Sequence, residues 1–212
     1  MHDGSQLVHS KEARVADVLS PLRSHGSQKS SDRSRDATRM RTVEGRIKGM
    51  SENIGLYVDC GSLWHGSYAF NRASGSSNQK PRVDYKSLLE SVLGPEKAHA
   101  LKRAYLVGRT KVNMDGFREA LGAFGYQVKC VNEFAPGSKT ARMVMLGDIM
   151  AEAATWDRII VATQDPFFSA ALCDLKMMGK KVEVACFGAL PAEYSVLGVA
   201  HSELDQSVIF SP

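Results

Sequence analysis

Three aspartates of this 212-residue chain stand where their carboxylates could act together. Asp59 ends the apolar run IGLYVD, Asp165 follows the apolar run RIIVAT, and Asp148 interrupts the apolar segment MVMLGDIMAEA. A carboxylate in an apolar segment is costly unless it is paired, exposed or bound to a cation. Oxygen ligands suit Mg²⁺ or Mn²⁺, and such a centre can activate water to attack a phosphodiester. The three aspartates are therefore candidate metal ligands and catalytic residues.

Alternating apolar and amphipathic segments must position these carboxylates. We expect strands at 54–59, 102–108, 126–131, 158–163 and 181–187, helices at 83–94, 114–125, 139–155, 166–179 and 190–200, and a short strand or tail at 207–210. This alternation predicts an α/β fold, a three-layer, doubly wound, mostly parallel sheet of five or six strands. Ligands of such sheets bind beyond the carboxyl ends of the strands. Asp59 and Asp165 therefore share one rim if their strands are neighbours.

Each aspartate also has a simpler interpretation. Asp59 is also a residue that forms a turn ahead of Cys-Gly-Ser, and Asp165 is a good helix N-cap because Pro166 follows it. Asp148 is placed to form a salt bridge with Arg142 or Lys139. Aspartates at strand ends also occur in phosphatase, receiver and nucleotide-binding folds. The glycines form neither a Walker loop nor a GxGxxG motif, which argues against a classical nucleotide cofactor.

The composition separates a leader from a folded domain. Residues 1–50 contain ten Lys or Arg against six Asp or Glu, whereas residues 51–212 contain seventeen of each. We therefore expect a basic, disordered leader at 1–52, which adds salt-dependent attraction to RNA or DNA, and a domain at 53–212. The stretch KEARVADVLSPL in the leader is either a flexible tail or a short partner-binding helix. The absence of a long apolar run, a signal peptide or a CxxC pair predicts a cytoplasmic protein with free thiols and no membrane association.

Basic and aromatic side chains flank the expected rim. Arg109 and Lys111 follow the second strand, where they would meet phosphates or lie in a solvated loop. Trp64, His65 and Tyr68 follow the first strand, where aromatic rings suit single-stranded RNA, a hydrophobic lid or a dimer contact. RNA and a protein partner or second copy are therefore the expected partners.

From Ile54 to Phe210 the sequence resembles NYN domains of the PIN-like nuclease group, close to the LabA-like branch. The resemblance rests on the first strand with its Asp-x-x-x-Leu continuation, on FREALGAFGYQVK, on a helix led by lysine, and on WDRIIVATQDPFFSAALCDLKMMGKKVEVACF. It implies an RNA-directed domain with a doubly wound parallel sheet. It also implies an acidic cluster that holds Mg²⁺ or Mn²⁺ for phosphodiester hydrolysis.

Several positions depart from the pattern of that family. Ser62 stands where the family has Asn, and Arg142 stands where it has a metal-binding Asp. Phe167 replaces the second acid of the Ser-Gly-Asp-x-Asp-Phe motif, whose first acid corresponds to Asp165. A guanidinium at position 142 would pair with Asp59 or Asp165 and place a positive charge where the metal would sit.

Two functions follow from the resemblance. One is a metal-dependent endoribonuclease with a reduced acidic centre, and the other is an inactive pseudo-nuclease that binds RNA or a protein. Asp59, Asp148 and Asp165 are the predicted catalytic and metal-binding residues. The predicted nucleic-acid-binding residues are Ser62, Trp64, Arg109, Lys111, Lys139 and Arg142.

Overall fold

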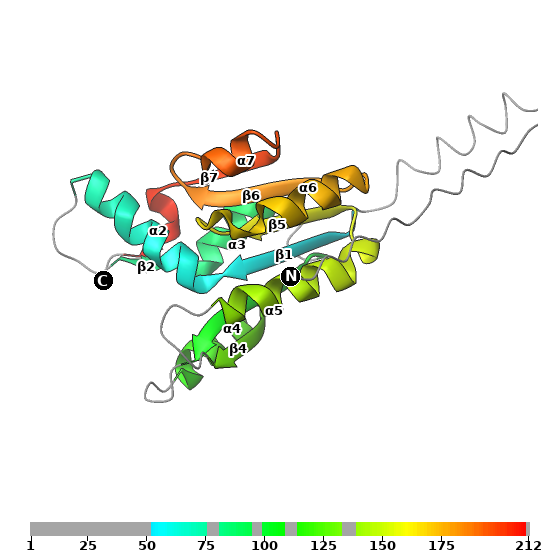
Figure 1. The fold of residues 1–212 in the computed structure, drawn as a ribbon. Helices are drawn as coiled ribbons and strands as arrows, with labels where there is room; N and C mark the ends of the chain where they lie inside the picture. The colour runs from blue at the N-terminus through cyan, green and yellow to red at the C-terminus, as the bar shows by residue number, and fades with distance from the viewer. Residues whose placement is uncertain (1–51, 76–80, 95–98, 109–113, 133–138, 211–212) are drawn as a thin grey trace, which may run out of the picture. The chain divides into compact units, whose positions relative to one another are not determined.

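The structure is a computed structural model, and it describes residues 52–75, 81–94, 99–108, 114–132 and 139–210 (Figure 1). Residues 1–51 of the predicted leader, and Arg109 and Lys111, lie outside the described residues. The strands are β1 Ile54–Asp59, β2 Arg82–Val83, β3 Leu101–Gly108, β4 Gln127–Asn132, β5 Arg158–Ala162, β6 Lys181–Phe187, β7 Ala200–Leu204 and β8 Ile209–Phe210. The helices are α2 Cys60–Ala73, α3 Tyr85–Leu93, α4 Asp115–Ala123, α5 Thr140–Glu152, α6 Ser169–Met177 and α7 Ala192–Ser195.

Six parallel strands form the main sheet in the order β4-β3-β1-β5-β6-β7. The chain builds outward from β1 through β3 to β4, and α5 then returns it to β5 on the other side of β1. The direction of winding therefore reverses between β1 and β5, which is where ligands bind in doubly wound sheets. The predicted fold class is confirmed, and its six-strand form is the observed one.

Burial on both faces explains why the strands are continuous apolar runs. All six residues of β1 are buried. Ile54, Leu56 and Val58 face the cluster that contains residues of α2, α3 and α4, whereas Tyr57 faces the cluster beneath α5 and α6. Successive side chains of a strand point to opposite faces of the sheet, so both helix layers pack against apolar side chains of β1. Burying each large apolar side chain contributes roughly 1.5–3 kcal/mol to the stability of the fold.

Local signals set the ends of α3 as the sequence predicts. The Asp84 side chain accepts hydrogen bonds from the backbone N–H groups of Lys86 at 3.0 Å and Ser87 at 3.2 Å. The helix stops at Gly94, whose φ of 51° is in the region that favours glycine. The Asp84 cap and the Gly94 stop are therefore confirmed.

Four elements differ from the expectation. Residues Arg82–Val83 form the short strand β2, and α7 covers only Ala192–Ser195 of the expected helix 190–200. Helix α2 begins directly after β1, in a segment for which no helix is predicted, and residues 200–204 form the edge strand β7 at the end of the expected helix 190–200. All four cysteines are free thiols, and Cys60 and Cys186 are buried as expected, whereas Cys173 is half-buried and Cys130 is exposed. Within the described ranges, no helix has the length and apolar character needed to cross a bilayer.

Candidate functional site

Asp59 joins the end of β1 to the start of α2. Its Oδ1 atom accepts the backbone N–H of Ser62 at 2.9 Å and so caps the helix. Its Oδ2 atom is buried and has no hydrogen-bond partner. Burial raises the pKa of the Asp59 carboxyl above 3.8, against the opposing effects of the Ser62 N–H and the positive charge of Arg142. A buried acceptor of this kind favours a positive charge beside it.

Asp165 lies three residues beyond the end of β5 and has both predicted features. Its Oδ1 atom accepts the N–H of Phe167 at 2.9 Å, which caps the short 3-10 helix Pro166–Phe168. Its Oδ2 atom lies 2.9 Å from Nη1 of Arg142. The hydroxyl of Tyr194 donates to the Asp165 carbonyl and fixes the backbone there. One carboxylate oxygen therefore caps the turn while the other faces the rim.

Arg142, in the first turn of α5, lies between these two aspartates. Its Nε atom is 3.5 Å from Asp59 Oδ2, and its Nη1 atom is 2.9 Å from Asp165 Oδ2. The separation from Asp59 is that of an ion pair without a good hydrogen bond. The side chain is 31% exposed, so the guanidinium covers the aspartates and still reaches solvent. The two carboxylates and one guanidinium carry a formal charge of −1.

Ser62 and Gln164 hold the two halves of the rim together. Ser62 Oγ accepts the backbone N–H of Gln164 at 2.8 Å and the hydroxyl of Thr163 at 3.1 Å. The Gln164 side chain pairs with the backbone of Phe187, accepting its N–H at 2.7 Å and donating to its carbonyl at 3.0 Å. Ser62 is buried, and these bonds engage its hydroxyl with the two residues that follow β5.

Gln164 also packs tightly against α2, a role that the sequence pattern does not predict. A Cβ on Gly66 would lie 2.3 Å from Gln164 Cγ, so only glycine fits at position 66 beside this side chain. The family motif has glycine at the position of Gln164. A glycine inside the segment LWHGSYAF was the available signal, because glycine in a helix often marks a close approach.

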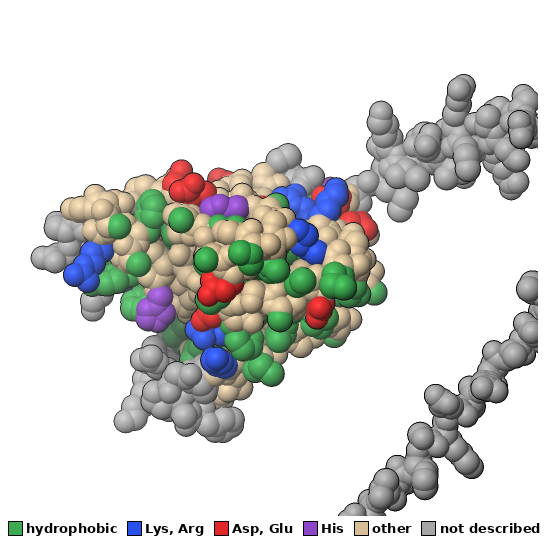
Figure 2. All heavy atoms as spheres, turned by 45° about the horizontal axis from the view of Figure 1, so that its top comes forward, with side chains coloured by type: hydrophobic (Ala, Val, Ile, Leu, Met, Phe, Trp, Pro, Cys, Tyr) green, Lys and Arg blue, Asp and Glu red, His purple; other side chains and the backbone are tan. Residues whose placement is uncertain are grey.

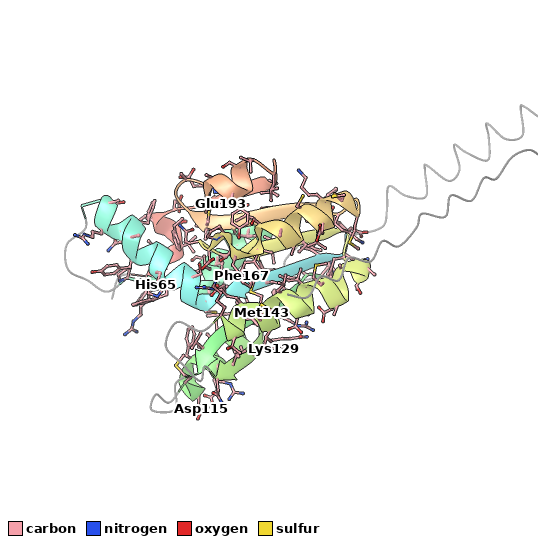
Figure 3. All side chains as sticks on the ribbon, viewed as in Figure 1. His65, Asp115, Lys129, Met143, Phe167 and Glu193 are labelled. Atoms are coloured by element: carbon pink, nitrogen blue, oxygen red, sulfur yellow. The ribbon has the colours of Figure 1, made fainter. Side chains whose placement is uncertain are left out.

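Asp148 belongs to a different cluster, six residues along α5 from Arg142. Its Oδ2 atom accepts the hydroxyl of Tyr105 at 2.5 Å and the ammonium of Lys129 at 2.6 Å, and Arg103 lies 3.9 Å away. Figure 3 shows Lys129 on β4 beside α5. Burial raises the pKa of the Asp148 carboxyl, but the bonds from Lys129 and Tyr105 outweigh it and leave the pKa below 3.8. Asp148 therefore anchors α5 to β3 and β4, and its contacts are with these strands rather than with Asp59 or Asp165.

Lys139 and Phe167 form another part of the rim. The Lys139 ammonium lies 5.6 Å from the centroid of the Phe167 ring, within the range of a cation–π contact. Phe167 packs edge-on against the buried Phe168, with ring centroids 5.2 Å apart, where β5 leads into α6 (Figure 3). The second acid of the family motif is thus replaced by a ring that contacts a cation.

A cleft of about 510 Å³ opens beside these charges. Asp59 and Arg142 line one part of it, and Trp64, Met114 and Phe117 line apolar parts. Figure 2 shows acidic and basic side chains next to each other among hydrophobic ones on this side of the molecule, with no broad patch of a single sign. On this face, attraction for an anion therefore comes from individual basic groups such as Arg142.

With Arg142 in this position, the residues fit a divalent cation poorly. Its guanidinium lies between the two carboxylates that such a cation would bridge. Within the parts of the chain that the structure describes, no three His, Cys, Asp or Glu side chains are arranged to hold a metal ion. Arg142 instead supplies the positive charge that stabilises the buried Asp59 Oδ2 atom.

Comparisons with known proteins agree with the fold. The model of the NYN domain family matches residues 53–200. A crystal structure of a protein of unknown function from Vibrio parahaemolyticus has a TM-score of 0.61 and 18% sequence identity. The match covers 76% of this chain and 98% of that one, and it concerns the fold alone. A comparison with curated proteins finds no match.

Proposed function

The chain belongs to the NYN domain family, and we propose that it binds single-stranded RNA at the rim of Asp59, Asp165 and Arg142 without a divalent metal. The family has a PIN-like, nuclease-type fold, which supports nucleic acid as the class of ligand. The position of the rim supports the same proposal, because it lies at the point between β1 and β5 where the winding of the sheet reverses.

The ion-paired Arg142 is the observation that carries this proposal. A metal centre of the family type needs carboxylates free to bind a cation, whereas here both acids already face a guanidinium. Arginine has five N–H donors in a fixed plane, and two close ion pairs leave donors for a phosphate oxygen. Arg142 is partly exposed, which keeps those donors within reach of a ligand.

The start of α5 supplies further groups that suit a phosphate. Lys139 is the N-cap residue of α5 and makes no side-chain cap hydrogen bond, and the start of a helix carries the positive end of the helix dipole. Lys139 itself adds a full positive charge beside Arg142 on the same turn. Together these groups offset the formal charge of −1 on the ion-paired cluster. Arg109 and Lys111 are proposed as further phosphate contacts.

A second candidate is a metal-dependent endoribonuclease. The buried Asp59 Oδ2, which has no hydrogen-bond partner, favours it, because this atom would accept a Mg²⁺ or Mn²⁺ ion if Arg142 moved away. In this candidate Asp59 and Asp165 would hold the ion. Asp148, predicted from the sequence as a third ligand, would first have to leave Tyr105 and Lys129.

An RNA incubation with and without metal separates the two candidates. The full chain is mixed with a labelled single-stranded RNA in Mn²⁺ or in EDTA, with Asp59→Asn and Asp165→Asn as controls. The proposal predicts retention of intact RNA in both buffers. Cleavage in Mn²⁺ that both substitutions abolish would instead establish the endoribonuclease. No affinity for RNA at low salt would contradict both candidates.

A further inference from the structure

Two aromatic side chains on α2 leave almost half of their surface in water. Trp64 is 45% exposed and Tyr68 is 48% exposed. Positions four apart in a helix are neighbours on its surface, so the two rings stand next to each other along α2. Adjacent exposed aromatic side chains form an apolar patch, and Tyr and Trp are enriched at contact sites.

The two rings lie nearly parallel to each other on α2. Their centroids are 6.5 Å apart and their planes differ by 24°. Stacked bases repeat about every 3.4 Å, so a base with a neighbour on each face spans about 7 Å. The centroid distance is the upper limit of the gap between the two ring planes, so the exposed side chains have to rotate slightly apart to admit one planar base.

The neighbouring side chains hold the first ring and connect the pair to the rim. His65, which Figure 3 labels, packs against Trp64 with ring centroids 4.8 Å apart and planes at 71°, an edge-on contact that supports the indole from the side. Trp64 lines the same cleft as Arg142 and Asp59. Five residues of α2 from Asp59 to Trp64 rise about 7.5 Å. A nucleotide with its phosphate at Arg142 would therefore have its base within reach of the pair.

We propose that Trp64 and Tyr68 form a sandwich for one unpaired nucleobase of the bound strand. The inference rests on the proposed RNA-binding function and adds a second contact, which recognises the flat faces of a base rather than the phosphate. Stacking of this kind accepts all four bases, because each has two π faces. The ligand is therefore single-stranded nucleic acid with little sequence preference at this position.

Affinity measurements on single and double variants test the sandwich. Trp64→Ala and Tyr68→Ala each weaken binding of a short single-stranded RNA about 5- to 150-fold, the range for losing one stacked base. Because both rings hold the same base, their contributions are coupled, and the loss in the double variant is smaller than the product of the two single losses. Trp64→Phe and Tyr68→Phe keep a ring and lose much less. Val196→Ala, at another exposed apolar side chain, leaves the affinity unchanged.

The outcomes distinguish failure of the sandwich from failure of RNA binding. Losses that multiply in the double variant would mean two separate stacking positions and would overturn the sandwich. Wild-type affinity in both alanine variants would overturn it as well, while RNA binding through Arg142 would still stand. If the wild-type chain does not bind RNA, the proposed function fails and the sandwich fails with it.

Discussion

Replacing Arg142 with aspartate is expected to turn the ion-paired rim into a cation site. The substitution removes the guanidinium that lies 2.9 Å from Asp165 Oδ2 and 3.5 Å from Asp59 Oδ2. It adds a third carboxylate at the position where the family has a metal-binding acid. Three carboxylates near one point repel each other in the absence of a cation and bind Mn²⁺ in its presence.

The contacts of Arg142 set the expected changes in unfolding free energy. Two unit charges 4 Å apart near a protein surface interact by about 4 kcal/mol before solvent exposure is discounted. Since Arg142 and Asp165 are about one-third and one-quarter exposed, we expect the metal-free variant to lose about 2–4 kcal/mol of unfolding free energy. Mn²⁺ at a hundred times its dissociation constant would restore about 2.7 kcal/mol. For a domain of this size that raises the melting temperature by about 5–10 °C.

Thermal unfolding in EDTA and in Mn²⁺ measures both effects. Arg142→Asp should melt below the wild type in EDTA and recover in Mn²⁺, whereas the wild type should show no metal-dependent shift. Arg142→Gln is the matched control, because it removes the same positive charge without adding a ligand. An equal Mn²⁺ shift in the wild type and in Arg142→Asp would refute the idea that Arg142 takes the place of the cation.

Two further predictions concern the groups that support the rim. Gly66→Ala puts a Cβ 2.3 Å from Gln164 Cγ and should cost about 1–3 kcal/mol of unfolding free energy in denaturant titrations. In a Gln164→Ala background the same change should be neutral or stabilising by up to about 1 kcal/mol, and an undiminished cost there would contradict the packing argument. The second concerns Asp148, whose lowered pKa adds stability above 3.8 that disappears as the pH falls through the folded-state value. Asp148→Asn should therefore be less stable than the wild type at pH 7, with a gap that narrows below pH 3.8, and a gap independent of pH would exclude this linkage.

The sequence predicts the central strands well because each is buried on both faces. Short continuous apolar runs such as residues 54–59 and 158–163 are typical of strands that are covered on both faces of a sheet. Helix α2 was not predicted because CGSLWHGSYAFNRA contains glycine and serine at its buried positions, where close packing to Gln164 overrides helix propensity. Edge strand β7 was not predicted because AHSEL has only Leu204 buried.

The positions of Asp59 and Asp165 could be predicted because they depend only on the order of the strands in the sheet. Asp59 and Asp165 meet because their parallel strands β1 and β5 are neighbours, and the Arg142 ion pairs follow from the resemblance and from charge. The partners of Asp148 depended on side chains from other strands, Tyr105 and Lys129. Helical periodicity did contain a signal, because six residues turn the helix by 600° and so point Asp148 about 120° away from Arg142.

RNA affinity in EDTA, compared between the wild type and Arg142→Gln, tests the central claim most directly. Both proteins keep the basic leader, so its contribution to the RNA affinity cancels in the comparison. Lys181→Gln is the charge-matched control, because it removes one positive charge at the start of β6, at the opposite end of the sheet from the rim. We predict metal-independent binding by the wild type, about tenfold weaker binding by Arg142→Gln, and unchanged binding by Lys181→Gln. Equal affinities for the wild type and Arg142→Gln, or binding that requires Mn²⁺, would contradict the claim that Arg142 is the cation of this rim.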